Sequence, residues 1–316
     1  MRVAGRRPRV LAVGDAIVDV LVPPLPRRPR GDAQHQVPRL RFVAGGNATN
    51  FALQSAALGA RTTFVGCVGR DRPASVLLDA YRSAHVEARL RRDARPTGAT
   101  VALASADGSR VLVTAPGANA ALRLRDVPAR SLEAADHVHR AGYWWTPGLQ
   151  GRPTATLLAR ARRAGASTSL DVATEPSGWS PRRVASVHAC LRQVTTFFGN
   201  EAEVRAIGGR TDPLEAAHAL CRLGAREVVL HRGANGAVWV SGHDVVASPA
   251  FRIRTENPTG CGDVFNAAFV FARLRREDVP TSLRFANACA ALHLEDASRP
   301  YPSAGDINAF LRRRVR

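Results

Sequence analysis

The sequence contains no lysine, and all 45 of its basic residues are arginine. A P-loop needs a lysine against its phosphates and a protein kinase needs a strand lysine, so neither kind of nucleotide site fits this chain. The dinucleotide pattern Gly-x-Gly-x-x-Gly is also missing, because Phe265 stands three residues after Gly262. A phosphate site in this protein must therefore be built from other groups.

Cysteine is scarce and scattered, with five residues, an odd number, and no C-x-x-C pair. This usage is evidence against a disulfide framework and a zinc site, and it favours free thiols in the cytoplasm. No apolar run approaches the ~20 residues that a membrane span needs. Asp15 and Asp19 interrupt the apolar N-terminal run, and no small-residue cleavage site follows it. We therefore expect a first β-strand and a cytoplasmic protein rather than an exported one.

Acidic residues are few, 26 against 45 arginines, which gives a formal net charge of +19. Such an excess can indicate nucleic-acid binding. The arginines are, however, spread over the whole length in short groups without interleaved aromatic residues, and abundant arginine and alanine are typical of GC-rich coding. We expect a general attraction to anionic substrates rather than specific binding of nucleic acid.

The order of apolar segments predicts an α/β protein. Candidate strands and helices alternate along most of the chain, which favours a mostly parallel sheet with helices on both faces. The expected strands are 9–22, 62–69, 137–144, 167–172, 194–200, 227–233 and 236–240, and the expected helices include the segment after Gly46, 153–164, 212–223 and the segment after Gly262. Two β-rich runs within 99–114 flank Asp107-Gly108, a strong hairpin signal. We expect one domain over residues 1–316, with 23–43 and 95–115 as smaller β insertions.

The stretch "TGCGDVF" is the main chemical motif. Gly260 and Gly262 let a ligand approach the backbone at the start of a helix, where unpaired N–H groups and the helix dipole favour an anion. Asp263 fits a base that takes a proton from a hydroxyl group attacking a bound phosphate. The alternative is an acidic residue that merely stabilises a helix start after a tight turn.

Residues 257–263, "NPTGCGD", resemble the C-terminal signature of the ribokinase family of carbohydrate kinases, also called the phosphofructokinase-B family. Further segments resemble the family in the right order: "VGDAIVD", "GGNATNFALQSAALGARTTFVGCVGRD", "PGANAAL", "GNEAE", "RGANGA" and "FANACAAL". The resemblance implies a ribokinase-like three-layer α/β/α sandwich with a mostly parallel central sheet. It also implies a small β-sheet lid, formed by the two insertions, that excludes water on closing and often mediates a homodimer.

The resemblance assigns roles to the residues of the motif. Asp263 is expected to be the catalytic base, and the N–H groups of Gly260, Cys261 and Gly262 are expected to form an anion hole. Cys261 replaces the usual alanine, which matters little if only its backbone is used. Asn257 replaces the usual aspartate, which leaves open whether a monovalent cation activates the protein.

The resemblance also implies sites for ATP, Mg²⁺ and an acceptor. Asn200 and Glu203 match an Asn-x-x-Glu motif that orders Mg²⁺ and its waters, although an ordinary helix N-terminus has the same residues. The residues expected at the nucleotide are Asn200, His231, Gly233, Gly236 and Asn287. The residues expected at the acceptor are Asp19, Gly45, Gly46, Asn47 and Asn50, with Arg140, Tyr143, Trp144 and Trp145 as weaker candidates. Asparagine and aspartate suit vicinal hydroxyls, but helix capping and a strand-end turn explain them equally well.

These expectations describe an ATP- and Mg²⁺-dependent phosphotransferase acting on a hydroxyl of a small sugar. Two alternatives remain open: a nucleoside kinase on the same fold, and a non-catalytic protein that binds a sugar or nucleotide. The expected partners are a small-molecule acceptor and a second copy of the chain, with no membrane.

Overall fold

A computed structural model describes residues 6–25, 31–32, 34–105, 110–253, 260–296 and 301–314. Within these residues the main sheet has nine strands in the order β13-β12-β11-β10-β9-β8-β1-β4-β5. Their bounds are β1 Arg9–Val13, β4 Arg61–Val68, β5 Glu87–Arg92, β8 His137–Arg140, β9 Ser167–Asp171, β10 Thr196–Asn200, β11 Glu227–His231, β12 Ala237–Ser241 and β13 Asp244–Ser248. All pairings from β5 to β11 are parallel, and β12 and β13 add an antiparallel edge.

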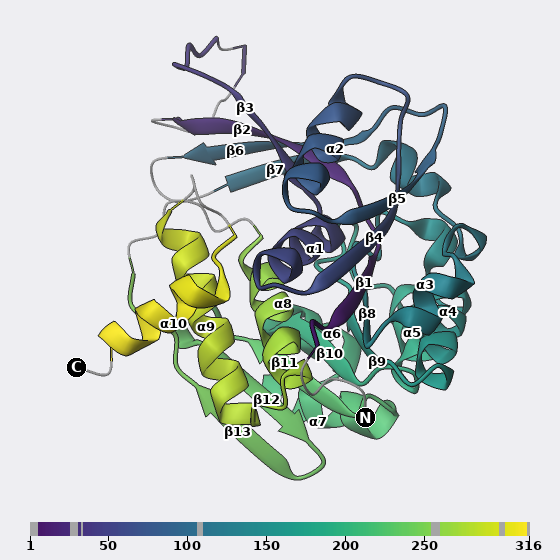
Figure 1. Cartoon of the computed structure of the whole chain (residues 1–316), viewed down its shortest axis with the longest axis vertical. Helices are drawn as coiled ribbons and strands as arrows, with labels where there is room; N and C mark the ends of the chain where they lie inside the picture. Colours follow the sequence, from purple (N-terminus) through teal and green to yellow (C-terminus); the bar gives the residue numbers. More distant parts are fainter. Residues whose placement is uncertain are drawn as a thin grey trace.

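Helices cover both faces of the main sheet (Figure 1). Alternation along β1 shows why: Val10 and Ala12 pack in one apolar cluster, and Leu11 and Val13 pack in the other. The first cluster includes side chains of α1 Asn47–Ala57, α2 Pro73–Ser83, α8 Cys261–Leu274, α9 Val279–Glu295 and α10 Ala304–Arg313. The second includes side chains of α3 Ala129–Ala134, α4 Arg152–Arg163, α5 Pro181–Leu191, α6 Glu201–Gly208 and α7 Pro213–Leu223. The predicted three-layer α/β/α sandwich is confirmed.

A separate four-stranded sheet in the order β3-β2-β6-β7 lies above α1, α8 and α10 in the view of Figure 1. Its strands are β2 Ile17–Leu25, β3 Arg41–Gly45, β6 Gly98–Ser105 and β7 Arg110–Ala115. The predicted hairpin of 99–114 is present as β6 and β7, although its Asp107-Gly108 turn lies outside the described residues. The sheet also uses residues outside 23–43 and 95–115, since β2 starts at Ile17 and β3 ends at Gly45.

The prediction of one strand over 9–22 was wrong. The chain leaves the main sheet at Val13 and enters the small sheet at Ile17. The side-chain amide of Asn119 supports this transition, because its Oδ1 accepts from the N–H of Ala16 at 2.8 Å and its Nδ2 donates to the carbonyl of Ala16 at 2.9 Å. Ala16 thus has its backbone hydrogen bonds satisfied by a side chain, which a periodicity pattern cannot reveal.

The strand expected at 137–144 is shorter than predicted and ends at Arg140. Gly142 turns the chain with a φ of 62°, and a Cβ at this position would lie 2.2 Å from the carboxylate of Asp15. A glycine is therefore required where the chain passes behind this buried acid. No helix within the described part of the chain is long and apolar enough to span a membrane.

We predict that Asn119→Ala destabilises the protein by about 2 kcal/mol, because the buried backbone groups of Ala16 lose their partner. Urea unfolding measures the change, and Asn235→Ala at an exposed position is the matched control. Equal stability of the two variants would show that the junction between the sheets does not depend on this amide.

Candidate active site

The expected site residues gather at the carboxyl ends of the parallel strands. In the sheet order β1 lies between β8 and β4. After β1 the chain first forms β4 and β5 on one side of this strand, and it later forms β8 on the other side. Such a switch point opens a crevice in which α/β proteins bind ligands. Asp15 follows β1, Asp171 ends β9 and Asn200 ends β10, which brings their side chains to this edge.

The N-terminus of α8 begins after a glycine. Gly260 precedes the helix with a φ of 79°, a conformation that side chains rarely adopt, and no side chain caps the helix. Gly260 itself has no side chain that could accept hydrogen bonds from the first-turn N–H groups. Together with the helix dipole they form a place for an anion.

Asp263 is 3% exposed and has two side-chain donors. Its Oδ1 accepts from Nδ2 of Asn47 at 3.1 Å, and its Oδ2 accepts from Nδ2 of Asn50 at 2.9 Å. Burial raises the pKa of Asp263 well above its usual value, and the charge of Asp171 acts in the same direction. The two amide donors lower this pKa but do not cancel the effect of burial. The result is a carboxyl group with raised basicity in the first turn of α8.

Asp15 positions the two asparagines. Gly46, the cap residue of α1, has no side chain, and Asp15 accepts from the N–H groups of Asn47 at 3.1 Å and Ala48 at 2.9 Å instead. The acid fixes the first turn of α1, from which Asn47 and Asn50 reach Asp263. The two asparagines thus donate to an acid of another helix rather than cap their own helix.

Asp19 lies in β2, in the row of the small sheet that also holds Thr100. It is 8% exposed, and a Cβ on Gly45 would lie 2.0 Å from its Oδ2, so Gly45 must lack a side chain. No hydrogen-bond donor to this carboxylate is found among the described residues. Burial, with a smaller contribution from Asp15, raises the pKa of Asp19 to about 7. A buried carboxylate without a donor is suited to accept hydrogen bonds from ligand hydroxyls.

A polar chain links strands β9 and β11 to α8. Asn266 donates from Nδ2 to Oδ2 of Asp171 at 2.7 Å, so its Oδ1 is left to accept from Nε2 of His231 at 2.9 Å. Burial lowers the pKa of His231, while Glu203 and the Asn266 hydrogen bond act in the opposite direction. A Cβ on Gly262 would lie 3.6 Å from Nδ1 of His231. The imidazole therefore borders the proposed anion site.

Asn200 and Glu203 form a reciprocal capping box at the start of α6. Oδ1 of Asn200 accepts from the N–H of Glu203 at 3.0 Å, and Oε2 of Glu203 accepts from the N–H of Asn200 at 2.9 Å. Asn200 and Glu203 thus do cap the helix, as the alternative interpretation of the motif predicted. Glu203 is nevertheless 4% exposed, and burial followed by the charge of Asp171 raises its pKa.

This donor set fits a hydrated Mg²⁺ ion. In the described ranges no three Asp, Glu, His or Cys side chains converge as ligands of a bare metal ion. Mg²⁺ keeps much of its water shell, and carboxylate oxygens engaged in a capping box retain lone pairs for those waters. A cation near Asp171 and Glu203 would also relieve the repulsion that raises the pKa of Glu203.

Gly236, after β11, and Asn287, in α9, both lie against the carbonyl group of Ser248. A Cβ on Gly236 would lie 2.1 Å from the carbonyl oxygen of Ser248, and Asn287 donates from Nδ2 to that same oxygen at 3.1 Å. Gly233 has a φ of 54° and open space where a side chain would be. Asn287 thus fixes the turn after β13. Gly233 leaves open space beside the turn that follows β11.

The weaker acceptor candidates have structural contacts. Arg140 is fully buried, lies 5.5 Å from the ring centroid of Tyr143 and donates to Thr146. Tyr143 is also buried and donates to the carbonyl of Ser186 at 2.9 Å, and Trp144 donates to the carbonyl of Ala173 at 3.1 Å. Tyr143 and Trp144 pack in the second apolar cluster, so their contacts are explained by packing.

The sequence analysis missed four polar residues of the site. Asp15, Asp171 and Asn266 are described above, and Tyr301 donates its hydroxyl to Oδ1 of Asn50 at 2.9 Å. The only available signal was chemical, a buried-type carboxylate or amide after an apolar run, as in "VGD", "LDV" and "VFN". Residues 257–259 of the motif lie outside the described residues.

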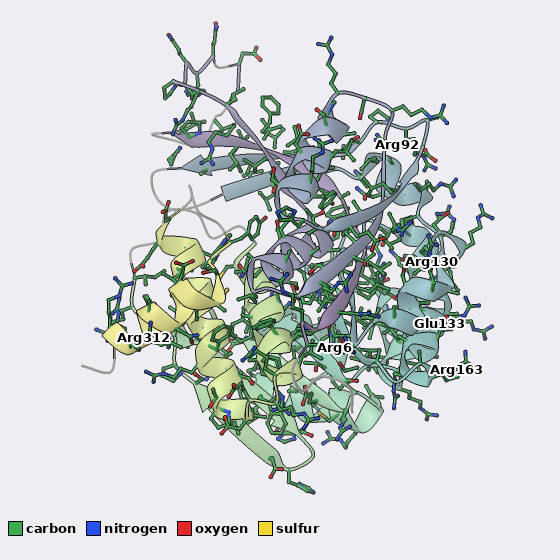
Figure 2. The ribbon with its side chains drawn as sticks, in the orientation of Figure 1. Arg6, Arg92, Arg130, Glu133, Arg163 and Arg312 are labelled. Carbon is green, nitrogen blue, oxygen red and sulfur yellow. The ribbon has the colours of Figure 1, made fainter. Side chains whose placement is uncertain are left out.

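Arginine side chains leave the molecule on opposite sides. The labelled Arg163 and Arg312 project from α4 and α10 at the two flanks of the view in Figure 2, and Arg92 and Arg130 belong to yet other elements. This distribution agrees with a general positive charge rather than one binding stripe.

Comparison with known proteins gives a consistent result. The profile of the pfkB family carbohydrate kinases matches residues 7–301. An ATP-dependent ribose-1-phosphate kinase from Halopiger xanaduensis is 28% identical over 312 residues, covering 97% of this chain and 99% of that protein. A nucleoside kinase from Methanothermobacter thermautotrophicus is 28% identical over 292 residues, covering 91% and 89%.

Solved structures show the same fold. Ribokinase from Arabidopsis thaliana, complexed with ribose and ATP, superimposes with a TM-score of 0.82 at 22% identity over 97% of this chain and 99% of the other. Fructokinase from Xylella fastidiosa with bound ATP gives a TM-score of 0.82 at 21% identity over 98% and 99%. The chain belongs to the pfkB family of carbohydrate kinases.

Asp19 provides a test of the site electrostatics. The pKa of Asp19 is raised to about 7 from 3.8, so its ionisation opposes folding. The resulting penalty is absent below about pH 4, grows as the pH rises and is complete above about pH 7. We predict that Asp19→Asn becomes progressively more stable than the wild type between pH 4 and 7, with a constant difference above pH 7. Urea unfolding across this range measures the difference, and a pH-independent gap would contradict the assignment.

Proposed function

We propose that this carbohydrate kinase transfers the γ-phosphoryl group of ATP to a hydroxyl of a small sugar or sugar-like acceptor. The observation that carries the proposal is the position of Asp263, a buried carboxylate in the first turn of a helix whose cap residue is a glycine, with Tyr301 close enough to both Asp263 and Asp19 for their charges to raise its pKa. The relatives named as ribose-1-phosphate kinase and nucleoside kinase support a ribose-bearing acceptor.

Asp263 is the base in this proposal. Its raised pKa makes the ionised form a stronger proton acceptor than an exposed aspartate, while Asn47 and Asn50 keep a fraction ionised and fix the direction of both oxygens. The proton of the acceptor hydroxyl passes to Asp263 as the oxygen attacks phosphorus. The activity therefore falls as the pH drops below the pKa of Asp263, because the protonated acid cannot take up that proton.

The N–H groups of Gly260, Cys261 and Gly262 stabilise the charge of the transferred group. They are fixed by the helix before the reaction, so little reorganisation is needed when charge develops. His231 borders Gly262 and is a further candidate for contact with a phosphate oxygen. The thiol of Cys261 has no role in this scheme.

ATP with Mg²⁺ supplies the phosphoryl group and neutralises phosphate charge. Asn200 and Glu203 would order the waters of the ion at the end of β10. Gly233 and Gly236 form the turn on which the nucleotide lies, and Asn287 holds the loop behind that turn. Two structural neighbours are described as complexes with ATP, which supports ATP as the nucleotide.

The acceptor lies between Asp19, Gly45, Gly46 and the two asparagines in this proposal. Asp19 accepts hydrogen bonds from acceptor hydroxyls and belongs to the small sheet, whereas Asp263 belongs to the main body. Movement of the small sheet would bring the two acids to the same ligand and exclude water, which is the action of a lid.

We also propose that the outer face of the lid pairs with a second copy of the chain. Phe42, Val101 and Val113 lie in one row across β3, β2, β6 and β7, opposite to the face of Asp19, and are 60%, 36% and 59% exposed. Val20 lies between them in the same row, so the face has no charge at its centre. An exposed apolar sheet face of this kind is stabilised by burial in a symmetric dimer.

We predict that Asp263→Asn folds normally but reduces turnover by about 10²–10⁴-fold, because the asparagine amide cannot take up the hydroxyl proton. A coupled assay of ADP release measures turnover over a panel of ribose, ribose 1-phosphate, fructose and nucleosides. Asp244→Asn, an exposed acid at the start of β13, is the control and should retain wild-type turnover.

Near-normal turnover of Asp263→Asn would remove the assignment of the base. Absence of ADP release by the wild type with every acceptor, combined with measurable binding of ATP, would favour the non-catalytic binding protein instead.

We predict that the double variant Phe42→Glu, Val113→Glu elutes with half the mass of the wild type in size-exclusion chromatography with light scattering. Two acids in the apolar row would face their symmetry mates and resist burial. Val245→Glu, on an exposed valine of β13, should retain the wild-type mass. A monomeric wild type, or an unchanged mass of the double variant, would contradict a dimer through the lid.

A further inference from the structure

Tyr301 lies at a position that connects the acceptor pocket with the proposed base. It is partly buried and precedes α10, which places it far along the chain from Asn50. Its hydroxyl donates to Oδ1 of Asn50 at 2.9 Å, and Nδ2 of the same amide donates to Oδ2 of Asp263 at 2.9 Å. One asparagine amide is thus held at both ends, by a phenol on one side and by a carboxylate on the other.

The orientation of the Asn50 amide decides whether Asp263 faces a hydrogen-bond donor or a hydrogen-bond acceptor. A carboxamide has a donor end and an acceptor end of nearly equal size, so rotation by about 180° exchanges them at little steric cost. With its nitrogen toward Asp263, Asn50 stabilises the carboxylate; with its oxygen toward Asp263, it would repel the carboxylate. The Tyr301 hydroxyl binds the oxygen end and thereby selects the first orientation.

Tyr301 remains a donor over the working pH range. Burial raises the pKa of the phenol above its usual value, and the nearby charges of Asp263 and Asp19 act in the same direction. The hydroxyl therefore stays protonated at neutral pH. Gly260 lets the amide nitrogen approach, since a Cβ there would lie 3.0 Å from Nδ2 of Asn50.

We propose that Tyr301 is a positioning residue that acts through Asn50 to keep Asp263 in the ionised form that accepts the proton from the acceptor hydroxyl. This inference rests on the proposed function, because it presupposes that Asp263 is the base. It adds a residue near the C-terminus to the reaction machinery and gives it a defined effect, the setting of the pH at which the base becomes active.

Other titratable groups face Asp263 or border its helix N-terminus. They are Asp15 and Asp171 through their charges, His231 next to Gly262 and His293 next to Gly260, and the charge of Asp19 acts on Tyr301 itself. None of these groups is altered by removal of the Tyr301 hydroxyl. A change of the pH profile in Tyr301→Phe would therefore reflect the Asn50 amide rather than a lost charge.

The test is the acid limb of the pH profile of kcat/KM. Tyr301→Phe should move this limb to higher pH by about one unit, which corresponds to a weakened hydrogen bond to a charged group. Asn50→Ala, which removes the donor itself, should move it in the same direction. In the Asn50→Ala background, Tyr301→Phe should cause no further shift, because its path of action is gone.

Tyr81→Phe is the matched control. Tyr81 is a buried tyrosine whose hydroxyl lies 2.7 Å from Oγ1 of Thr49, one residue before Asn50 on the same helix. Both phenylalanine variants remove a hydroxyl that contacts α1, so a merely structural effect would alter both proteins alike. We expect Tyr81→Phe to alter the thermal midpoint without moving the acid limb.

Three results would overturn the proposal: an unmoved acid limb in Tyr301→Phe, an unmoved limb in Asn50→Ala, or an equal shift by Tyr301→Phe with and without Asn50. Failure of the underlying function is distinguishable from these results. It would appear as near-normal turnover of Asp263→Asn, whereas the present proposal fails with Asp263 still essential.

Discussion

The structure depends on the contact between the first turn of α1 and the first turn of α8. Two asparagine amides of α1 donate to Asp263, and Gly260 allows the close approach of Asn50. This contact joins the start of α1, which follows β3 of the small sheet, to the start of α8, where we propose that an anion binds. The two amides offset part of the cost of ionising Asp263, which is high because this acid is only 3% exposed.

The surrounding residues maintain this contact from behind. Asp15 fixes the first turn of α1 through two N–H groups, and Gly142 leaves room for that acid. Asp171, Asn266 and His231 form a second polar chain along α8. The acids and the histidine of both supports lie at or just after the carboxyl ends of the parallel strands β1, β9 and β11.

The sequence was sufficient for those features that are local or repeated. Alternating apolar segments predicted the parallel sheet, and the Gly260–Asp263 stretch predicted an open helix start, because both patterns depend on neighbours along the chain. The division of 9–22 into two strands was not predictable, since it depends on Asn119 more than 100 residues away. Tyr301 was missed for the same reason: a tyrosine near a C-terminal helix has no local property that indicates a bond to Asn50.

The central claim is that Asp263 and the N–H groups of Gly260, Cys261 and Gly262 act on the two partners of one phosphoryl transfer. A crystal structure with a non-hydrolysable ATP analogue and an acceptor found in the turnover assay tests this most directly. The account predicts γ-phosphate oxygens on those N–H groups and an acceptor hydroxyl within hydrogen-bond distance of the Asp263 carboxylate. A γ-phosphate bound away from the start of α8, or an acceptor with no hydroxyl near Asp263, would contradict it.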